Sequence, residues 1–388
     1  MKTTKSVSTL LIVALMLAGC GTPETQDPSA ATQASAQSLA LAERAGAPLF
    51  DGMGQYEMPI TTQDADAQRY FNQGMVLAFA FNHAESIRSF RAAQTLDPTC
   101  AMCFWGEALA TGPNINVTSK GKVIMAPAER EAAYAALQQA IARQGNVTPR
   151  EQGYISALAN RYDGDVNSDR TPLDLAWAEA MGELAAAYPE DMTAASIYAE
   201  ALMNTMPWNY WADDGIAKPE TSAVIAALDR VLDVEPNHPL ALHLYIHALE
   251  ASNDPGRAEA AADRLANLVP GAGHLVHLPS HIYYRVGRSN DAAIANQRAA
   301  DVDEAYIAAC NAQGFYPALY YPHNIHFLWA ASTMQGQSAV SIESARRVVA
   351  NVRVEQVQAF PTVEFFRTVP LLSLVRFGKW DEILAEPH

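Results

Sequence analysis

The sequence predicts an all-α protein built from stacked helical hairpins, and three observations lead to this prediction. From residue 63 onward, alanine is abundant and the strict alternation of apolar and polar residues that marks strands is nearly absent. Apolar residues recur instead at helical spacing between short turns. Pro236 and Pro270 are 34 residues apart, an interval typical of helical repeats. Such an array can form one continuous body of this length.

Composition limits the classes of partner. The chain has 388 residues, of which 49% are hydrophobic and 18% charged, as in ordinary globular proteins. Its formal net charge is −16. Binding to nucleic acid requires lysine and arginine against phosphate, so we expect no nucleic-acid partner.

Residues 1–20 have the pattern of an export signal. Lys2 and Lys5 precede a short apolar run, which is too short to span a bilayer. The run ends in Leu17-Ala18-Gly19-Cys20, which resembles a bacterial lipobox. This resemblance implies that Cys20 carries a lipid anchor, and Gly21 in place of aspartate implies the outer membrane, facing the periplasm. An ordinary cleaved signal with an incidental cysteine is the alternative.

Residues 21–62 are rich in Ser, Thr, Gln, Pro, Gly and Ala. This composition predicts a flexible, disordered tether that holds the folded body away from the membrane. We expect the body itself to extend over residues 63–388.

The first repeat is the clearest, in the sequence AQRYFNQGMVLAFAFNHAESIRSFRAAQTLDP of residues 67–98. Its first helix has an aromatic residue, Tyr70, and a small residue four positions later, Gly74. Its second helix has an aromatic residue and an alanine, Phe90 and Ala93, and Pro98 closes the repeat. This spacing resembles the tetratricopeptide repeat (TPR) family, although Gln73 and Ser86 replace a usual leucine and alanine. Gly287 and Gly336 fit later turns. The resemblance implies a right-handed superhelix with a concave groove.

Three inserts interrupt the hairpins, beginning at Gly112, at Met206 and near Cys310. The first two follow helices of similar sequence, so we expect loops that emerge on one edge of the solenoid. The second insert contains Trp208, Tyr210 and Trp211. Trp208 is a candidate for contact with a ligand, and packing of the loop onto its own solenoid is the alternative.

Seven of the ten histidines lie between residues 239 and 330. They are His243, His247, His274, His277, His281, His323 and His326. Within each group the spacing is three, four or seven residues, which places the rings on one face of a helix. The interval from His243 to His277 is 34 residues, and so is that from His247 to His281. The histidines therefore recur with the repeat.

The TPR resemblance places these histidines at the positions of the first helix that line the concave groove. It implies that all seven rings face one hollow. Glu250 and Tyr284 fall at the same kind of position and would support the rings or contact a ligand. Pro279 lies between His277 and His281, where it is expected to interrupt the helix and could move His281 out of phase.

Three interpretations fit this pattern. The rings could bind a transition metal ion (Zn, Cu or Fe), either for binding alone or for metal-dependent catalysis. They could line a groove for an anionic ligand, a peptide or a partner protein. They could also be buried structural histidines bonded to backbone carbonyls. We favour the metal. The sequence identifies no catalytic residue and contains no known hydrolase, nucleotide-binding or HExxH motif.

Two further features complete the prediction. Cys100 and Cys103 form a single CxxC, which predicts a local disulfide in an oxidising compartment. The last residues, from Pro361 to His388, begin a repeat and stop early in its second helix. Since solenoid ends need a polar cap, we expect either that the native chain continues or that a partner covers this end.

Overall fold

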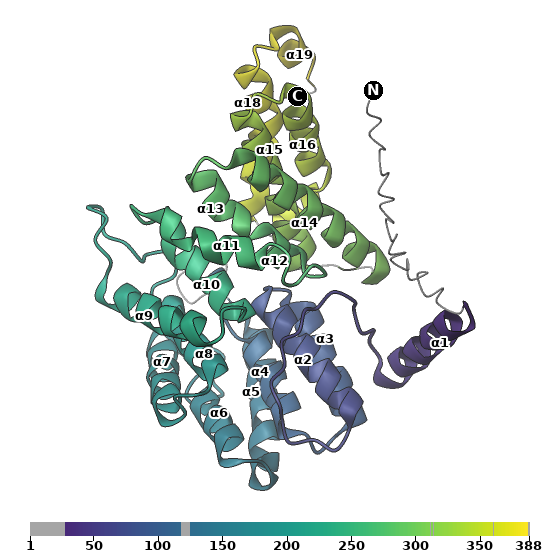
Figure 1. Ribbon diagram of the computed structural model, residues 1–388, viewed down its shortest axis with the longest axis vertical. Helices are drawn as coiled ribbons and strands as arrows, with labels where there is room; N and C mark the ends of the chain where they lie inside the picture. Colours follow the sequence, from purple (N-terminus) through teal and green to yellow (C-terminus); the bar gives the residue numbers. More distant parts are fainter. Residues whose placement is uncertain (1–27, 118–124, 311, 313, 360, 387–388) are drawn as a thin grey trace, which may run out of the picture.

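The computed structural model describes residues 28–117, 125–310, 312, 314–359 and 361–386 (Figure 1). Over these residues the protein is all-helical, with helices packed in adjacent pairs and without strands. An isolated bridge joins Trp211 to Ala217 in the second insert. The predicted all-α, solenoid-like class is thereby confirmed.

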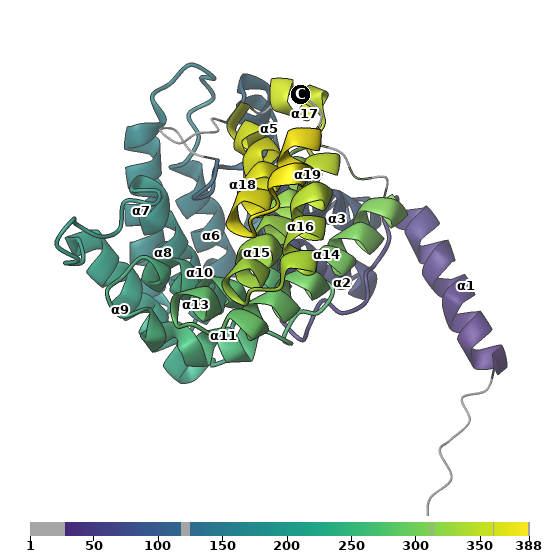
Figure 2. The ribbon, with the colours of Figure 1, turned by 90° about the horizontal axis from the view of Figure 1, so that it is seen from above.

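The first half of the solenoid contains the helices up to α9. They are α1 (Pro28–Ala45), α2 (Ala65–Phe79), α3 (His83–Leu96), α4 (Ala101–Thr111), α5 (Pro127–Arg143), η1 (Gln144–Asn146), α6 (Pro149–Ala159), α7 (Arg170–Ala187), α8 (Met192–Thr205) and α9 (Pro219–Val234). In Figure 2, α1 extends away from the other helices.

The second half carries the histidines. Its elements are α10 (Pro239–Glu250), η2 (Pro255–Ala258), α11 (Glu259–Leu265), α12 (Gly273–His277), α13 (Pro279–Arg285), α14 (Ser289–Cys310), the π-helical η3 (Tyr316–Tyr320), α15 (Tyr321–Met334), α16 (Ser338–Ala350), α17 (Val354–Ala359), η4 (Pro361–Thr368), α18 (Val369–Arg376) and α19 (Trp380–Ala385). The interruption predicted at Pro279 separates α12 from α13.

Helix starts follow from local chemistry. Thr148 caps α6 by accepting from the backbone N–H of Glu151, whose carboxylate accepts in return from Thr148 N at 2.9 Å. Pro149 occupies the first helical position, where its missing N–H has no intrahelical partner to lose. Asp64 and Asp191 cap α2 and α8 through their side chains.

Part of the segment predicted to be a tether packs against the helical body. Residues 47–62, which we call the strap, lie against the helical body, and Ala47 and Met58 are buried. Gln73 of α2 accepts from Phe50 N at 2.7 Å and donates to Pro48 O at 3.0 Å. The prediction of a tether over residues 21–62 is therefore wrong for the strap, because side-chain amides of α2 satisfy its backbone.

The strap links distant parts of the chain. Thr61 donates to Glu151 of α6 through both its backbone N–H and its hydroxyl, each at 2.6 Å. The Tyr56 hydroxyl lies 2.9 Å from Thr193 Oγ1 of α8. Gly271 N donates to Gly52 O at 2.9 Å, so the strap also reaches the loop before α12.

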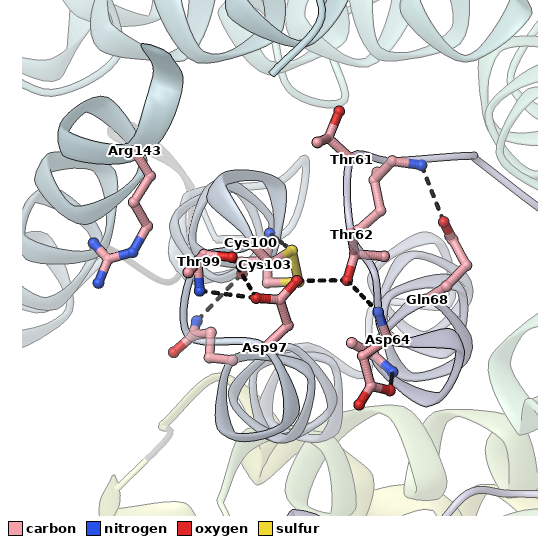
Figure 3. The surroundings of a disulfide bond; sticks show 12 residues. Thr61, Thr62, Asp64, Gln68, Asp97, Thr99, Cys100, Cys103 and Arg143 are labelled. Carbon is pink, nitrogen blue, oxygen red and sulfur yellow. Dashed lines mark hydrogen bonds between the residues drawn. A yellow bond between two sulfur atoms is a disulfide. The ribbon is translucent and has the colours of Figure 1, made fainter. Parts of the chain in front are cut away.

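The cysteine pair lies where the strap meets α4 (Figure 3). Cys100 and Cys103 form a disulfide at the start of this helix. Beside it, Asp97 accepts from the hydroxyls of Thr62 and Thr99, both at 2.6 Å. The end of the strap is thus fastened next to the disulfide.

The solenoid curves enough to bring its first and middle helices together. α10 packs against α2, and the His243 ring reaches Phe79 O, 164 residues earlier in the chain. The two views place α2, α10 and α14 around the same region (Figures 1 and 2). The candidate site lies at this junction.

The C-terminal helices pack on a smaller apolar cluster of their own, which includes Ile325, Val348 and Phe366. Beyond it, α18 and α19 leave Leu372 and Trp380 more than half exposed. Among the described helices, none combines the length and apolar character needed to cross a bilayer.

Candidate metal centre

The histidine rings reach one region from four helices. α10 supplies His243 and His247, α12 supplies His274 and His277, α13 supplies His281, and α15 supplies His323. Their donor atoms form two groups of three, and within each group they all lie within 4.8 Å of one another. The geometry therefore unites six of the seven predicted rings.

The inner group consists of His243, His247 and His274, all buried. Nε2 of His243, Nε2 of His247 and both ring nitrogens of His274 have no hydrogen-bond partner among the described residues. A buried polar atom without a partner costs about 1–3 kcal/mol. Four such atoms from three converging rings are unusual in a protein core and fit a metal ligand set.

Two acceptors set the protonation of the inner rings. His243 Nδ1 lies 2.5 Å from Phe79 O, and His247 Nδ1 lies 2.6 Å from Glu250 Oε1. Both acceptors require a proton on Nδ1, so in the neutral ring each Nε2 presents a lone pair to the group. Histidine ligands of metals almost always donate their second ring N–H in this way.

The outer group consists of His277, His281 and His323, of which His323 is partly exposed. His277 Nδ1 lies 2.6 Å from Asn296 Oδ1, and His281 Nδ1 lies 2.7 Å from Glu250 Oε2. The orientation of the Asn296 amide is fixed, because its Nδ2 donates to Ala292 O at 2.7 Å. Both histidines therefore donate through Nδ1.

The two Nε2 atoms of His277 and His281 then face each other at 2.8 Å. Each carries a lone pair in the neutral ring, so the contact is repulsive unless a cation lies between them. A proton or a metal ion can serve as that cation. Nitrogens in a tetrahedral zinc shell lie about 3.3 Å apart, so an opening of about half an ångström would admit the metal.

The pKa values of five rings favour the neutral form. Burial lowers the pKa of four of these rings well below the usual value, and neighbouring histidines lower it further, in His243, His274, His277 and His323. Burial also lowers the pKa of His247. These five rings are thus held neutral, the form that binds metals.

Glu250 connects the two groups. One carboxylate oxygen accepts from His247 and the other from His281. Burial alone would raise the pKa of Glu250, but His281 and His247 outweigh it and hold the pKa below its usual value. His247, Glu250 and His281 also form a third close group of donor atoms. Its contacts of 2.6–2.7 Å are hydrogen bonds and too short for neighbouring ligands of one ion, so Glu250 orients the rings.

Aromatic residues surround the imidazoles. Phe81 packs against His243 with ring centroids 4.4 Å apart, and Tyr320 packs against His274 at 4.9 Å. Trp208 meets His247 edge-on at 5.1 Å. Phe81 and Trp208 are the non-glycine residues with positive φ in the described chain, at 55° and 59°. Backbone strain of this kind concentrates at functional sites.

The predicted inserts meet at this site. Asn116 of the first insert donates to the Tyr320 hydroxyl of the third at 2.9 Å. Trp208 belongs to the second insert, and Trp211 of the same loop donates to Ala248 O at 2.8 Å. Trp208 thus packs against His247 while its loop packs onto the solenoid, as the alternative expected, and contact of Trp208 with a bound ligand stays a prediction.

Two predicted site residues lie elsewhere. His326 stacks on Trp329, with ring centroids 5.0 Å apart, and packs near Phe366 in the C-terminal cluster, outside all three close groups. Tyr284 is 37% exposed, and its ring centroid lies 6.4 Å from that of Phe327, which packs against His281. Despite the break at Pro279, His281 remains beside His277.

Sequence reasoning missed the residues that orient the rings. Phe79 O lies on α2 and Asn296 on α14, which carries no histidine, and no spacing rule links them to the site. The available signal for Asn296 was a polar residue at helical spacing among the alanines on the buried face of α14, which are Ala292, Ala295 and Ala299.

No protein-family model matches the chain, and no curated protein matches it. The TPR resemblance therefore stays a prediction. The proposed lipid attachment at Cys20 lies outside the described residues.

Proposed function

We propose that this protein binds a transition metal ion through the imidazoles of His243, His247, His274, His277, His281 and His323. The observation that carries the proposal is the 2.8 Å contact between the Nε2 atoms of His277 and His281. Both rings already donate through Nδ1, so a cation is needed between the two lone pairs.

The donor set narrows the choice of metal. All six ligands offered are neutral imidazoles, which suit zinc and copper and bind magnesium or calcium poorly. Iron usually adds a carboxylate ligand, and the nearby carboxylate, that of Glu250, already accepts from two rings. We therefore rank zinc and copper before iron.

Elemental analysis tests the proposal. The full-length chain is purified without chelators and without a metal-binding affinity tag, and bound metal is measured by mass spectrometry. We expect at least one equivalent of metal per chain. The double variant His247→Ala, His277→Ala should lose it, whereas His326→Ala, a matched histidine outside the groups, should retain it. A wild-type protein that stays metal-free after incubation with zinc and copper contradicts the proposal.

A groove for a peptide or partner protein was the alternative. The buried, mutually facing rings favour the metal, since a peptide groove needs accessible donors. The alternative gains if the metal-free protein captures a peptide, and if the double variant loses that peptide while His326→Ala retains it.

We propose further that the protein is a TPR-like lipoprotein anchored through Cys20 and facing the periplasm, with no nucleic-acid partner. The lipobox-like sequence supports the anchor, and the repeat motif supports the family. Membrane fractionation of wild type and Cys20→Ser tests the anchor. Equal amounts of both proteins in the membrane fraction would contradict it.

A further inference from the structure

We propose that the site holds two metal ions of different accessibility, a buried inner ion and an accessible outer ion, with ligands oriented by one shared carboxylate. The inner ion is bound by His243, His247 and His274, and the outer ion by His277, His281 and His323. This inference rests on the proposed metal-binding function and adds to it the number of ions, their inequality and the role of Glu250.

The number of metal ions follows from the grouping of the histidine donor atoms. A tetrahedral shell takes four ligands, and six converging rings exceed it. The donor atoms gather as two separate threes. Rings of different groups still approach each other, with centroids 5.0 Å apart for His247 and His281 and 5.6 Å for His274 and His277. Two adjacent ions use every ring. A single ion in the outer group would leave the unpartnered nitrogens of the inner group buried, and a single ion in the inner group would leave His277 Nε2 and His281 Nε2 facing each other.

The two ions differ in accessibility because the two groups of histidines differ in burial. Each ring of the inner group is at most 2% exposed, and Phe81 and Tyr320 pack against its members. In the outer group His323 is partly exposed. Each ion has three protein ligands, which leaves a fourth position for water or another ligand. Only the outer ion has a ligand that reaches the surface, so solvent and small ligands reach its fourth position more easily. The outer ion is therefore the one that would accept an external ligand.

Charge predicts the class of that ligand. Six neutral imidazoles and one carboxylate leave two divalent ions with a net charge of three, in a partly buried site. A small anion at the open position, such as hydroxide or azide, reduces this charge. We expect the outer ion to bind such an anion in preference to a neutral ligand.

Glu250 acts as a positioning residue for both ions. Its two oxygens accept from His247 of the inner group and His281 of the outer group. Removing its charge leaves both rings less firmly oriented and less basic. Changes of this kind outside the ligand set typically weaken metal binding by about 10–100-fold. Glu250→Gln should therefore weaken the binding of both ions and not of one alone.

Titration of the metal-free full-length chain with Co²⁺ is the test, because the visible spectrum of cobalt reports its coordination. We expect two equivalents for wild type and for His326→Ala. His274→Ala should retain only the outer ion, and His323→Ala only the inner one, so each should bind one equivalent. Azide should change the cobalt spectrum of wild type and His274→Ala, and leave that of His323→Ala unchanged. Glu250→Gln should weaken both binding steps.

The outcomes separate this inference from the proposed function. If wild type binds one equivalent and either single variant abolishes it, the protein is a metal protein but the two-ion inference is wrong. If no metal binds, the proposed function itself fails. Circular dichroism checks that the variants fold, and His274→Gln and His323→Gln replace any alanine variant that does not. An azide response that persists in His323→Ala would overturn the assignment of the accessible ion.

Discussion

A single amide decides the tautomer of His277. Asn296 cannot turn over without losing its bond to Ala292 O, so its oxygen stays directed at His277 Nδ1. The lone pair on His277 Nε2 is a consequence of that amide. Residues that touch no metal can therefore govern its affinity.

Asn296→Leu removes the acceptor and should weaken metal binding by about 10–100-fold. Asn296→Asp keeps an acceptor of the same size and should retain most of the affinity. Competition with a chromophoric chelator measures both dissociation constants. Equal affinity in wild type and Asn296→Leu would show that the amide does not orient the ring.

Asp303 is a second residue whose ionisation depends on its surroundings. It is fully buried on α14, and burial raises its pKa to about 7, although hydrogen bonds from Tyr316 and Asn324 oppose the shift. Its charged form is therefore less favourable in the folded protein than in the unfolded chain.

Asp303 should make the free energy of unfolding decrease as the pH rises. The folded pKa lies above the unfolded value of 3.8, so Asp303 costs nothing below about pH 4. Its contribution to stability falls as the pH rises from about 4 to about 7, at up to about 1.4 kcal/mol per unit. Asp303→Asn should remove this slope. Urea unfolding of both proteins from pH 4 to 8 measures the difference, and parallel pH profiles would contradict the prediction.

At the scale of helices, small residues let α2, α3 and α4 approach closely. A Cβ atom on Gly106 would come within 2.3 Å of the Phe90 ring, and one on Gly74 within 2.8 Å. Phe90 itself is fully buried. The small residues around Phe90 are thus required by packing.

Gly106→Ala should destabilise the protein by about 1–3 kcal/mol, because it overpacks this contact. Gly145→Ala is the matched control, since an added Cβ there meets nothing within 4 Å. Urea denaturation gives both free energies of unfolding. Similar stabilities of the two variants would mean that Phe90 can move aside at little cost.

Helices were also where sequence reasoning succeeded. The spacing of His243 and His247, and that of His277 and His281, predicted shared faces, and these pairs do meet. His326 follows His323 by three residues, which also predicts a shared face, yet it turns toward Trp329 and the C-terminal cluster. The spacing of residues predicts which side chains share one face of a helix. The contacts of those side chains depend on the other helices that pack against that face.

For the whole molecule, the strap was the least predictable part. Its composition resembles that of a linker, yet Gln73 and Glu151 hold its backbone. Gln73 departs from the TPR pattern, and its bonds to the strap explain why a polar residue stands there. Contacts between segments so far apart in the chain leave no local signal in the sequence.

Metal binding should stabilise the whole solenoid, because the ligands come from four helices and His243 also contacts Phe79 of α2. At a free zinc concentration 100 times the dissociation constant, one ion should add about 2.7 kcal/mol to the free energy of unfolding. Thermal unfolding with zinc and with chelator measures the effect. The double variant His247→Ala, His277→Ala should show no such difference.

The indole of Trp208 is half exposed and rests edge-on against His247. This places a natural fluorophore next to the inner ligands. Copper(II) quenches nearby indoles, so emission should drop as copper enters. The chain has six tryptophans, and subtracting the signal of Trp208→Phe isolates this one. The fluorescence of Trp208 should therefore report whether copper occupies the inner group, without any added dye.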